Sequence, residues 1–241
     1  MANRNVETSP LVYARIAGFL YLLMAPLGAF GIMYVPSILI VPGDVVATAS
    51  NIMANELIFH LSIVSALIVQ IVQIFLVLVL YKLLKPVNKN HALLMVIFIL
   101  VAVPIAMLNE LNHFAVLLLL SGADYLAVFT IDQLQAMMSL FLELHQHGII
   151  IAQIFWGLWL FPMGYLVFKS GYLPRILGVL LIIGGFGYLI DSFTLFLFPK
   201  FGVTISKFTF LGEVLFPLWL LIKGVNVEQW EKRALENNCG A

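Results

Sequence analysis

The stretch from Ser170 to Phe198, SGYLPRILGVLLIIGGFGYLIDSFTLFLF, decides the fold class of this chain. It begins with the turn signal Ser170-Gly171, and after Pro174 about twenty apolar residues follow, thinned by glycines. A run of this length predicts a helix that spans a membrane. One carboxylate, Asp191, lies within the run. Because an acid inside a membrane span is costly, Asp191 is a candidate functional residue.

The composition extends this interpretation from one segment to the whole chain. The 241 residues are 63% hydrophobic and 10% charged, and the mean hydropathy is +1.08. A water-soluble domain of this size needs far more polar surface, so the chain is predicted to be an integral membrane protein with the lipid bilayer as its first partner. The formal net charge is zero, so no excess of positive charge is available to attract nucleic acid, and nucleic acid is not predicted as a partner. The single cysteine, Cys239, excludes an internal disulfide.

Apolar runs separated by short connections predict an all-α fold, with six transmembrane helices in one bundle that forms a single domain over residues 1–241. The predicted spans are about 11–35, 56–83, 91–120, 148–168, 173–198 and 204–222, and a tail follows over 223–241. Before the fourth span, Thr130-x-x-Gln133 has the spacing of a capping box. It predicts a short helix at the outer membrane surface.

Lysine and arginine fall unevenly on the two sides of this six-span arrangement. Of the twelve lysines and arginines, only Lys200 and Lys207 fall on the outer side. Because basic residues concentrate in cytoplasmic loops, both termini are predicted to lie in the cytoplasm, with the protein in the plasma membrane.

The ionisable residues inside the predicted spans lie at or above the middle of the membrane. At about 1.5 Å per residue, Asp191 lies roughly 27 Å from the cytoplasmic start of its helix, and Glu213 lies roughly 15 Å from the inner end of the last span. Glu110 and His113 lie in the outer part of the third span. The three acids would together cost roughly 10 kcal/mol if ionised and unpaired. We therefore expect these residues to line an outward-facing polar pocket, with His145 at its rim.

A second set of polar residues extends the predicted pocket. On the second span, Glu56, His60 and Gln70 fall within about 40° either side of one line along the helix. The full secondary set is Glu56, His60, Gln70, Asn109 and Gln153.

The fourth span carries a polar side of its own. Gln146, His147 and Gln153 share that side, and His145 is expected to point elsewhere unless Gly148 breaks the helix.

Three pairs of glutamate and histidine raise the alternative of a metal site. They are Glu56-x-x-x-His60, Glu110-x-x-His113 and Glu143-x-x-x-His147. Each pair places a carboxylate and an imidazole on one helical face, and the middle pair has the spacing used by di-iron bundles. The metal candidates are Glu110, His113, His60 and His147. Solvated helix ends are the simpler interpretation of the outer pairs, so no metal or cofactor is assigned.

Seven runs that together cover nearly the whole chain carry a resemblance to a known family. They are ARIAGFLYLL, VPGD, LYKLLKPVN, SGADYLAVFTIDQLQAM, FLELH, GYLVFKSGYLPRILGVLLIIGGFGYLIDSF and GEVLFPLWLLIKGVNVEQW. These runs resemble a family of bacterial multi-pass membrane proteins that is catalogued only as a domain of unknown function. The resemblance implies an all-helical membrane fold with no assigned activity. Gln73 stands where the family would place an acid, and Trp159 where it would place a histidine.

Three functions remain open from the sequence. The leading prediction is that the pocket binds or moves a small or lipid-like ligand, with proton linkage through Glu213. One alternative is a metal-dependent membrane enzyme that uses the glutamate and histidine pairs of the outer half. The other is a membrane scaffold or partner-binding subunit. The sequence contains no phosphate loop and no nucleophile elbow, so whether the protein is an enzyme stays open.

Overall fold

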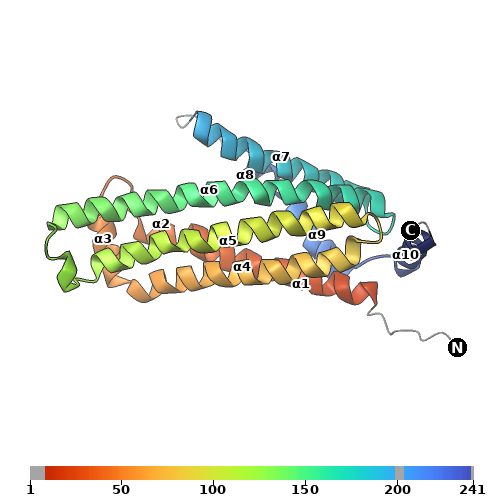
Figure 1. Ribbon diagram of the computed structural model, residues 1–241, viewed down its shortest axis with the longest axis horizontal. Coiled ribbons are helices and arrows are strands. Elements are labelled where there is room, and N and C mark those ends of the chain that lie inside the picture. The colour runs from red at the N-terminus through yellow and green to blue at the C-terminus, as the bar shows by residue number, and fades with distance from the viewer. Residues whose placement is uncertain (1–8, 199–203, 240–241) are drawn as a thin grey trace. The chain divides into compact units, whose positions relative to one another are not determined.

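The computed structural model describes residues 9–198 and 204–239, and all the regular secondary structure in these two ranges is helical (Figure 1). The helices are α1 (Pro10–Gly28), the π-helix η1 (Ala29–Tyr34), α2 (Val35–Leu39), α3 (Val45–Ala54), α4 (Glu56–Leu84), α5 (Lys89–Leu120), the 3₁₀-helix η2 (Asp124–Leu126), α6 (Ile131–Ser170), α7 (Arg175–Leu197), α8 (Ser206–Thr209), α9 (Leu211–Ile222) and α10 (Val227–Cys239). The predicted all-α fold class is confirmed.

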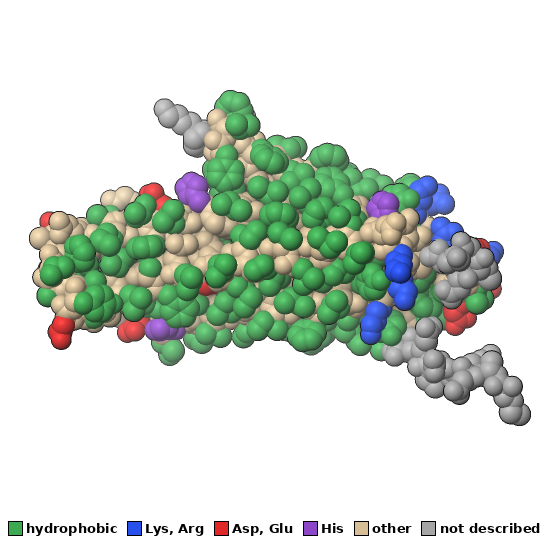
Figure 2. Space-filling model, viewed as in Figure 1, with side chains coloured by type: hydrophobic (Ala, Val, Ile, Leu, Met, Phe, Trp, Pro, Cys, Tyr) green, Lys and Arg blue, Asp and Glu red, His purple; other side chains and the backbone are tan. Residues whose placement is uncertain are grey.

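Five helical segments are long and apolar enough to cross a membrane. They are Pro10–Leu39, Glu56–Leu84, Lys89–Leu120, Ile131–Ser170 and Arg175–Leu197. A sixth span results if Ser206–Ile222 is counted together with Val227–Glu236, from which it is bent by 102°. Hydrophobic side chains also dominate the surface seen in Figure 2. The chain is therefore an α-helical membrane protein, and the cytoplasmic placement of its termini stays a prediction.

The chain forms two compact units that share four helices. Unit 1 comprises Met1–Leu23, Gln73–Ala102 and Gln153–Ala241, and unit 2 comprises Met24–Val72 and Val103–Ala152. Helices α1, α4, α5 and α6 each contribute one part to each unit, so the division does not follow a linker. The prediction of a single six-helix domain stays a prediction.

Unit 2 has an apolar core at the contact of α2 and α3 with its parts of α4, α5 and α6. The fully or nearly buried core residues include Leu39, Ile52, Ile63, Val116 and Met138. Local signals in the sequence start two of its helices. Asp44 caps α3 by accepting a hydrogen bond from the Ala47 amide at 2.8 Å. Thr130 and Gln133 form the predicted capping box at the start of α6, with hydrogen bonds of 2.9 and 3.3 Å.

Helix α6 corrects one predicted boundary. The expected surface helix and the fourth span form one continuous helix of 40 residues, Ile131–Ser170. Gly148 lies inside this helix, because a single glycine costs only about 1 kcal/mol relative to alanine, which packing readily offsets. The side chain of Asn109 fills the space beside Gly148. The predicted start of α6 is confirmed, whereas the break before residue 148 is not found.

In unit 1, α6 and α7 approach closely along glycines spaced seven residues apart. A Cβ atom on Gly164 would lie 2.6 Å from the backbone oxygen of Gly178, and one on Gly185 would lie 2.9 Å from the backbone oxygen of Gly157. Small residues at this spacing let two membrane helices meet backbone to backbone. The glycines of the fifth predicted span therefore serve helix packing.

The same unit anchors the C-terminal helix α10 on the end of α4. The phenol of Tyr172 and the indole nitrogen of Trp230 both donate to the backbone oxygen of Leu83 at 2.8 Å. The last carbonyls of a helix lack partners within it, so this oxygen is available for two donors. Lysine and arginine side chains gather at the end of the unit near α10 (Figure 2). Part of the tail predicted after the last span thus forms the helix α10, with Trp230 buried.

Candidate functional site

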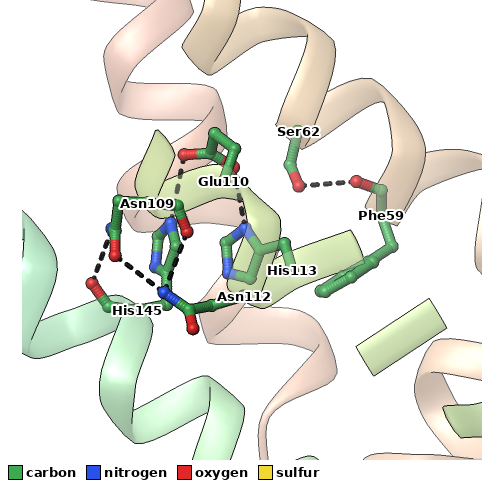
Figure 3. Close-up of polar contacts among 7 residues, drawn as sticks. All are labelled: Phe59, Ser62, Asn109, Glu110, Asn112, His113 and His145. Carbon is green, nitrogen blue, oxygen red and sulfur yellow. Dashed lines mark hydrogen bonds and ion pairs between the residues drawn. The ribbon is translucent and has the colours of Figure 1, made fainter. Parts of the chain in front are cut away.

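Three of the predicted site residues converge inside unit 2. Glu110 and His113 lie one turn apart on α5, and His145 faces them from α6 (Figure 3). One carboxylate oxygen of Glu110 lies 3.0 Å from Nδ1 of His113, and the other lies 3.1 Å from Nε2 of His145. The exposed fractions of the Glu110, His113 and His145 side chains are 5%, 9% and 12%. We call these three residues the Glu-His-His cluster.

Aromatic contacts hold the two imidazoles of the cluster. The rings of His113 and His145 stack with centroids 3.5 Å apart and planes inclined by 22°. Phe59 of α4 meets His113 edge-on at 5.1 Å, and the Ser62 hydroxyl donates to the Phe59 backbone oxygen at 2.7 Å. Three helices therefore restrict the orientation of the His113 ring.

A pair of asparagines fixes the contact between α5 and α6 beside the cluster. Asn109 donates its side-chain amide to the backbone oxygen of His145 at 2.8 Å. Asn112 donates to the backbone and side-chain oxygens of Asn109 at 3.1 and 2.9 Å. Because Asn109 lies over Gly148, where a larger residue would clash, the two helices can come close at this level. Asn109 and Asn112 therefore position His145 against Glu110.

The position of His145 corrects an expectation drawn from the polar side of the fourth span. His145 is directed toward α5 although α6 is unbroken. The packed face of α6 contains the buried residues Leu142 and Ala152, while Gln146 and His147 are exposed. Burial of apolar surface on this face determines the rotation of the helix.

The donor set of the cluster is suited to a divalent transition metal ion. One nitrogen of each imidazole and one oxygen of Glu110 all lie within 4.8 Å of one another. A bound ion about 2.0–2.2 Å from each ligand atom would require those atoms to be roughly 3–3.5 Å apart, which small side-chain rotations can supply. Two histidines and one carboxylate are the ligands of several zinc and non-haem iron sites, and three protein ligands leave coordination positions open.

Asp191, the carboxylate within the fifth predicted span, is held by backbone hydrogen bonds in unit 1. Its two carboxylate oxygens accept hydrogen bonds from the backbone amides of Ile205 and Ser206, at 2.6 and 2.8 Å. These hydrogen bonds connect the start of α8 to α7. The two backbone donors also offset the desolvation cost of the partly buried carboxylate. Both oxygens are engaged within the fold.

Glu213 and Gln153 lie in unit 1 with partners of their own. The Tyr21 hydroxyl donates to Glu213 at 2.7 Å, and Gln153 donates to the Tyr188 backbone oxygen at 3.3 Å. Gln70 is 5% exposed on α4, and its side-chain oxygen has no hydrogen-bond partner among the described residues.

The remaining metal candidates lie outside the Glu-His-His cluster. Glu56 and His60 form an exposed contact of 3.4 Å on α4. Nδ1 of His147 lies 2.8 Å from the Glu143 backbone oxygen. In the described part of the chain, the residues grouped closely enough to hold a metal are Glu110, His113 and His145.

Several contributing residues carried no clear signal in the sequence. Asn112, Tyr21 and Tyr188 lie inside apolar helices, and only their hydrogen-bond partners in the folded chain reveal a role. Gly148 signalled a helix break, and its actual role is to make room for Asn109. The signal in the sequence that points to Asn112 is its place one turn after Asn109, a residue of the predicted polar pocket.

The fold and the site together define an α-helical membrane protein with a buried Glu-His-His cluster. Residues 16–224 match the model of the family described as Domain of unknown function (DUF4386), and the chain belongs to this family. An uncharacterized protein of Archaeoglobus fulgidus is 36% identical over 168 residues, which cover 68% of this chain and 83% of that protein. No solved structure matches the chain. The resemblance to a family without assigned function is confirmed.

Proposed function

We propose that the protein is metal-dependent and holds a divalent transition metal ion at Glu110, His113 and His145. The observation that carries the proposal is the convergence of three metal-ligating side chains from two helices at a buried position. Asn109 and Asn112 support the cluster, as outer residues commonly support metal ligands. With three protein ligands, such an ion would keep open positions and could activate water or bind a substrate oxygen. This favours the metal-dependent membrane enzyme over the scaffold.

The test is the metal content of purified protein, measured by inductively coupled plasma mass spectrometry after growth with added zinc or iron. We expect about one zinc or iron ion per chain, and its loss in Glu110→Gln and His113→Gln. Glutamine at position 110 keeps one hydrogen-bond acceptor and one donor but removes the charged ligand, which favours retention of the fold. The matched control is His60→Gln, which removes an exposed histidine of the same unit. Metal-free wild type, or equal metal in all variants, would contradict the proposal.

A second candidate is the binding or movement of a small or lipid-like ligand. It is favoured by buried polar atoms that lack hydrogen-bond partners among the described residues, in particular the side-chain oxygen of Gln73 and the indole nitrogen of Trp156. Buried groups of this kind usually bind water or a ligand. The plasma membrane location and the cytoplasmic termini are part of the same proposal, supported by the bias of lysine and arginine.

Replacement of Gln73 by methionine tests this candidate. If the side-chain oxygen has no partner, its removal should raise the free energy of unfolding by about 1–3 kcal/mol, because an unsatisfied buried group is lost. If water or a ligand is bound there, the variant should be less stable and should lose any co-purified molecule seen by native mass spectrometry. Stabilisation of Gln73→Met would therefore argue against a ligand at this position.

A further inference from the structure

A second ionisable site, in unit 1, has one carboxyl group and two phenols. Tyr21 of α1 donates its hydroxyl to the Glu213 side chain on α9 at 2.7 Å. Tyr188 of α7 is a second hydrogen-bonding partner of the same carboxyl group. Three helices therefore meet at Glu213, which lies in the last predicted span.

Close backbone contacts on both sides hold this arrangement. A Cβ atom on Gly18, one turn before Tyr21, would lie 2.8 Å from the backbone of Pro217 and Leu221 on α9. A Cβ atom on Gly212, next to Glu213, would lie 2.6 Å from the backbone of Leu180 on α7. Since α9 touches both neighbouring helices at backbone distance, the carboxyl group and the phenols are held in place by the fold rather than by flexible side chains alone.

The charged groups near the site leave the Glu213 carboxyl without a counter-ion in the described part of the chain. On α7, one turn from Tyr188, Asp191 is engaged with two backbone amides. On α8, Lys207 is exposed. The groups that face Glu213 from α1 and α7 are the phenols of Tyr21 and Tyr188. An ionised carboxylate within a membrane span is costly, and a bound proton would remove its charge.

The phenols suit both protonation states of the carboxyl group. A tyrosine hydroxyl can donate or accept and rotates to suit its partner. With an ionised carboxylate, both hydroxyls donate. With a protonated carboxyl, the new O–H bond of Glu213 can donate to one phenol while the other phenol still donates. One proton can thus be gained from water or released to it while the hydrogen bonds to Tyr21 and Tyr188 are kept.

We propose that Glu213, with Tyr21 and Tyr188, forms a proton-binding site that takes up and releases one proton. Trp159 of α6 stacks on Tyr21 with ring centroids 6.0 Å apart. A change in the protonation of Glu213 that reorients the Tyr21 hydroxyl can therefore affect the contact between Tyr21 and α6. The proposal does not depend on the metal site, whose ligands lie in unit 2.

Infrared difference spectroscopy of the full-length protein in lipid tests the proposal directly. We would record spectra between about pH 4 and about pH 10, a range that brackets ordinary and strongly shifted carboxyl groups. The expected result is a carboxyl C=O band that titrates in the wild type and is absent in Glu213→Gln. The Tyr21→Phe variant should move the midpoint toward alkaline pH by about one to two units, because the hydrogen bond that Tyr21 donates is stronger to the ionised carboxylate than to the neutral carboxyl group.

Asp191→Asn is the matched control, since it removes a nearby carboxylate whose oxygens bind backbone amides. It should leave the titrating band in place. The proposal is overturned if Glu213→Gln retains the band, or if no carboxyl band assignable to Glu213 titrates in this range. Either outcome would make the contact between Tyr21 and Glu213 a purely structural hydrogen bond. Metal content would be unaffected by these variants, which separates this test from that of the metal site.

Discussion

The side chain of Asn109 occupies the space that a methyl group on Gly148 would fill. Asn109 also donates to the backbone oxygen of His145 at 2.8 Å, on the turn of α6 that precedes Gly148. The close approach of α5 to α6 therefore depends on a glycine and an amide. It brings His145 within 3.1 Å of Glu110, which lies next to Asn109 in the chain.

Replacement of Gly148 by alanine should displace Asn109 and weaken the contact of His145 with Glu110. We expect a loss of about 1–3 kcal/mol in the free energy of unfolding, from overpacking and a broken hydrogen bond. Thermal unfolding in detergent, followed by circular dichroism, measures this. Gly28→Ala is the control in the same unit, because a Cβ atom there meets nothing within 4 Å. That variant should be unchanged or more stable by up to about 1 kcal/mol. Equal effects of the two changes would argue against the role assigned to Asn109.

Two aspartates that bind backbone amides should respond differently to the same substitution. Asp191 uses both carboxylate oxygens, whereas Asp44 uses one oxygen to cap α3. An asparagine has one side-chain oxygen, so Asp191→Asn should lose about 1–2 kcal/mol and Asp44→Asn only a few tenths. Urea titrations of the two variants in mild detergent provide the comparison. A neutral Asp191→Asn would show that the second hydrogen bond adds nothing.

The shared acceptor at Leu83 predicts coupling between Tyr172 and Trp230. Each side chain donates to the same backbone oxygen at 2.8 Å. Removal of one donor by a change to phenylalanine should cost about 0.5–1.5 kcal/mol, since the other donor remains. Removal of both should cost more than the sum, because a buried carbonyl then loses its side-chain partners. A double-mutant cycle measures this coupling, and strict additivity would contradict it.

Tyr172 also predicts how stability changes in alkali. Burial raises the pKa of the Tyr172 phenol well above its ordinary value, although the positive charge of Arg233 partly opposes this. The unfolded chain therefore releases this proton at lower pH than the folded chain. The contribution is fully present below about pH 10 and is lost as the pH rises from there toward the raised folded value. Above pH 10, the free energy of unfolding of the wild type should fall with pH more steeply than that of Tyr172→Phe, by up to about 1.4 kcal/mol per pH unit. Equal slopes in the two proteins would contradict the raised pKa of Tyr172.

The ionisable residues that were predicted to line one polar pocket form separate groups in the structure, and each group has its own hydrogen-bond partners. Glu110, His113 and His145 are joined by hydrogen bonds in unit 2. Glu213 is bonded to Tyr21 in unit 1, and Asp191 binds backbone amides there. Depth within a predicted span indicated which ionisable side chains need a hydrogen-bond or ion-pair partner, because the free-energy cost of an unpaired charge depends on its distance from water. Depth could not predict which partner each side chain has, since backbone amides, phenols and imidazoles can all donate a hydrogen bond to a carboxylate.

The sequence by itself determined the class of protein, the number of apolar segments to within one and the start of several helices. These features depend on run length and on local capping groups such as Asp44 and Thr130, which act within a few residues. Only the tertiary structure decided that α6 is continuous and that His145 faces Glu110. These features depend on which helix faces pack together, and packing at positions such as Asn109 and Gly148 joins residues far apart in the chain. A single sequence records the residue types and not their contacts, so the convergence of the Glu-His-His cluster emerged only from the folded chain.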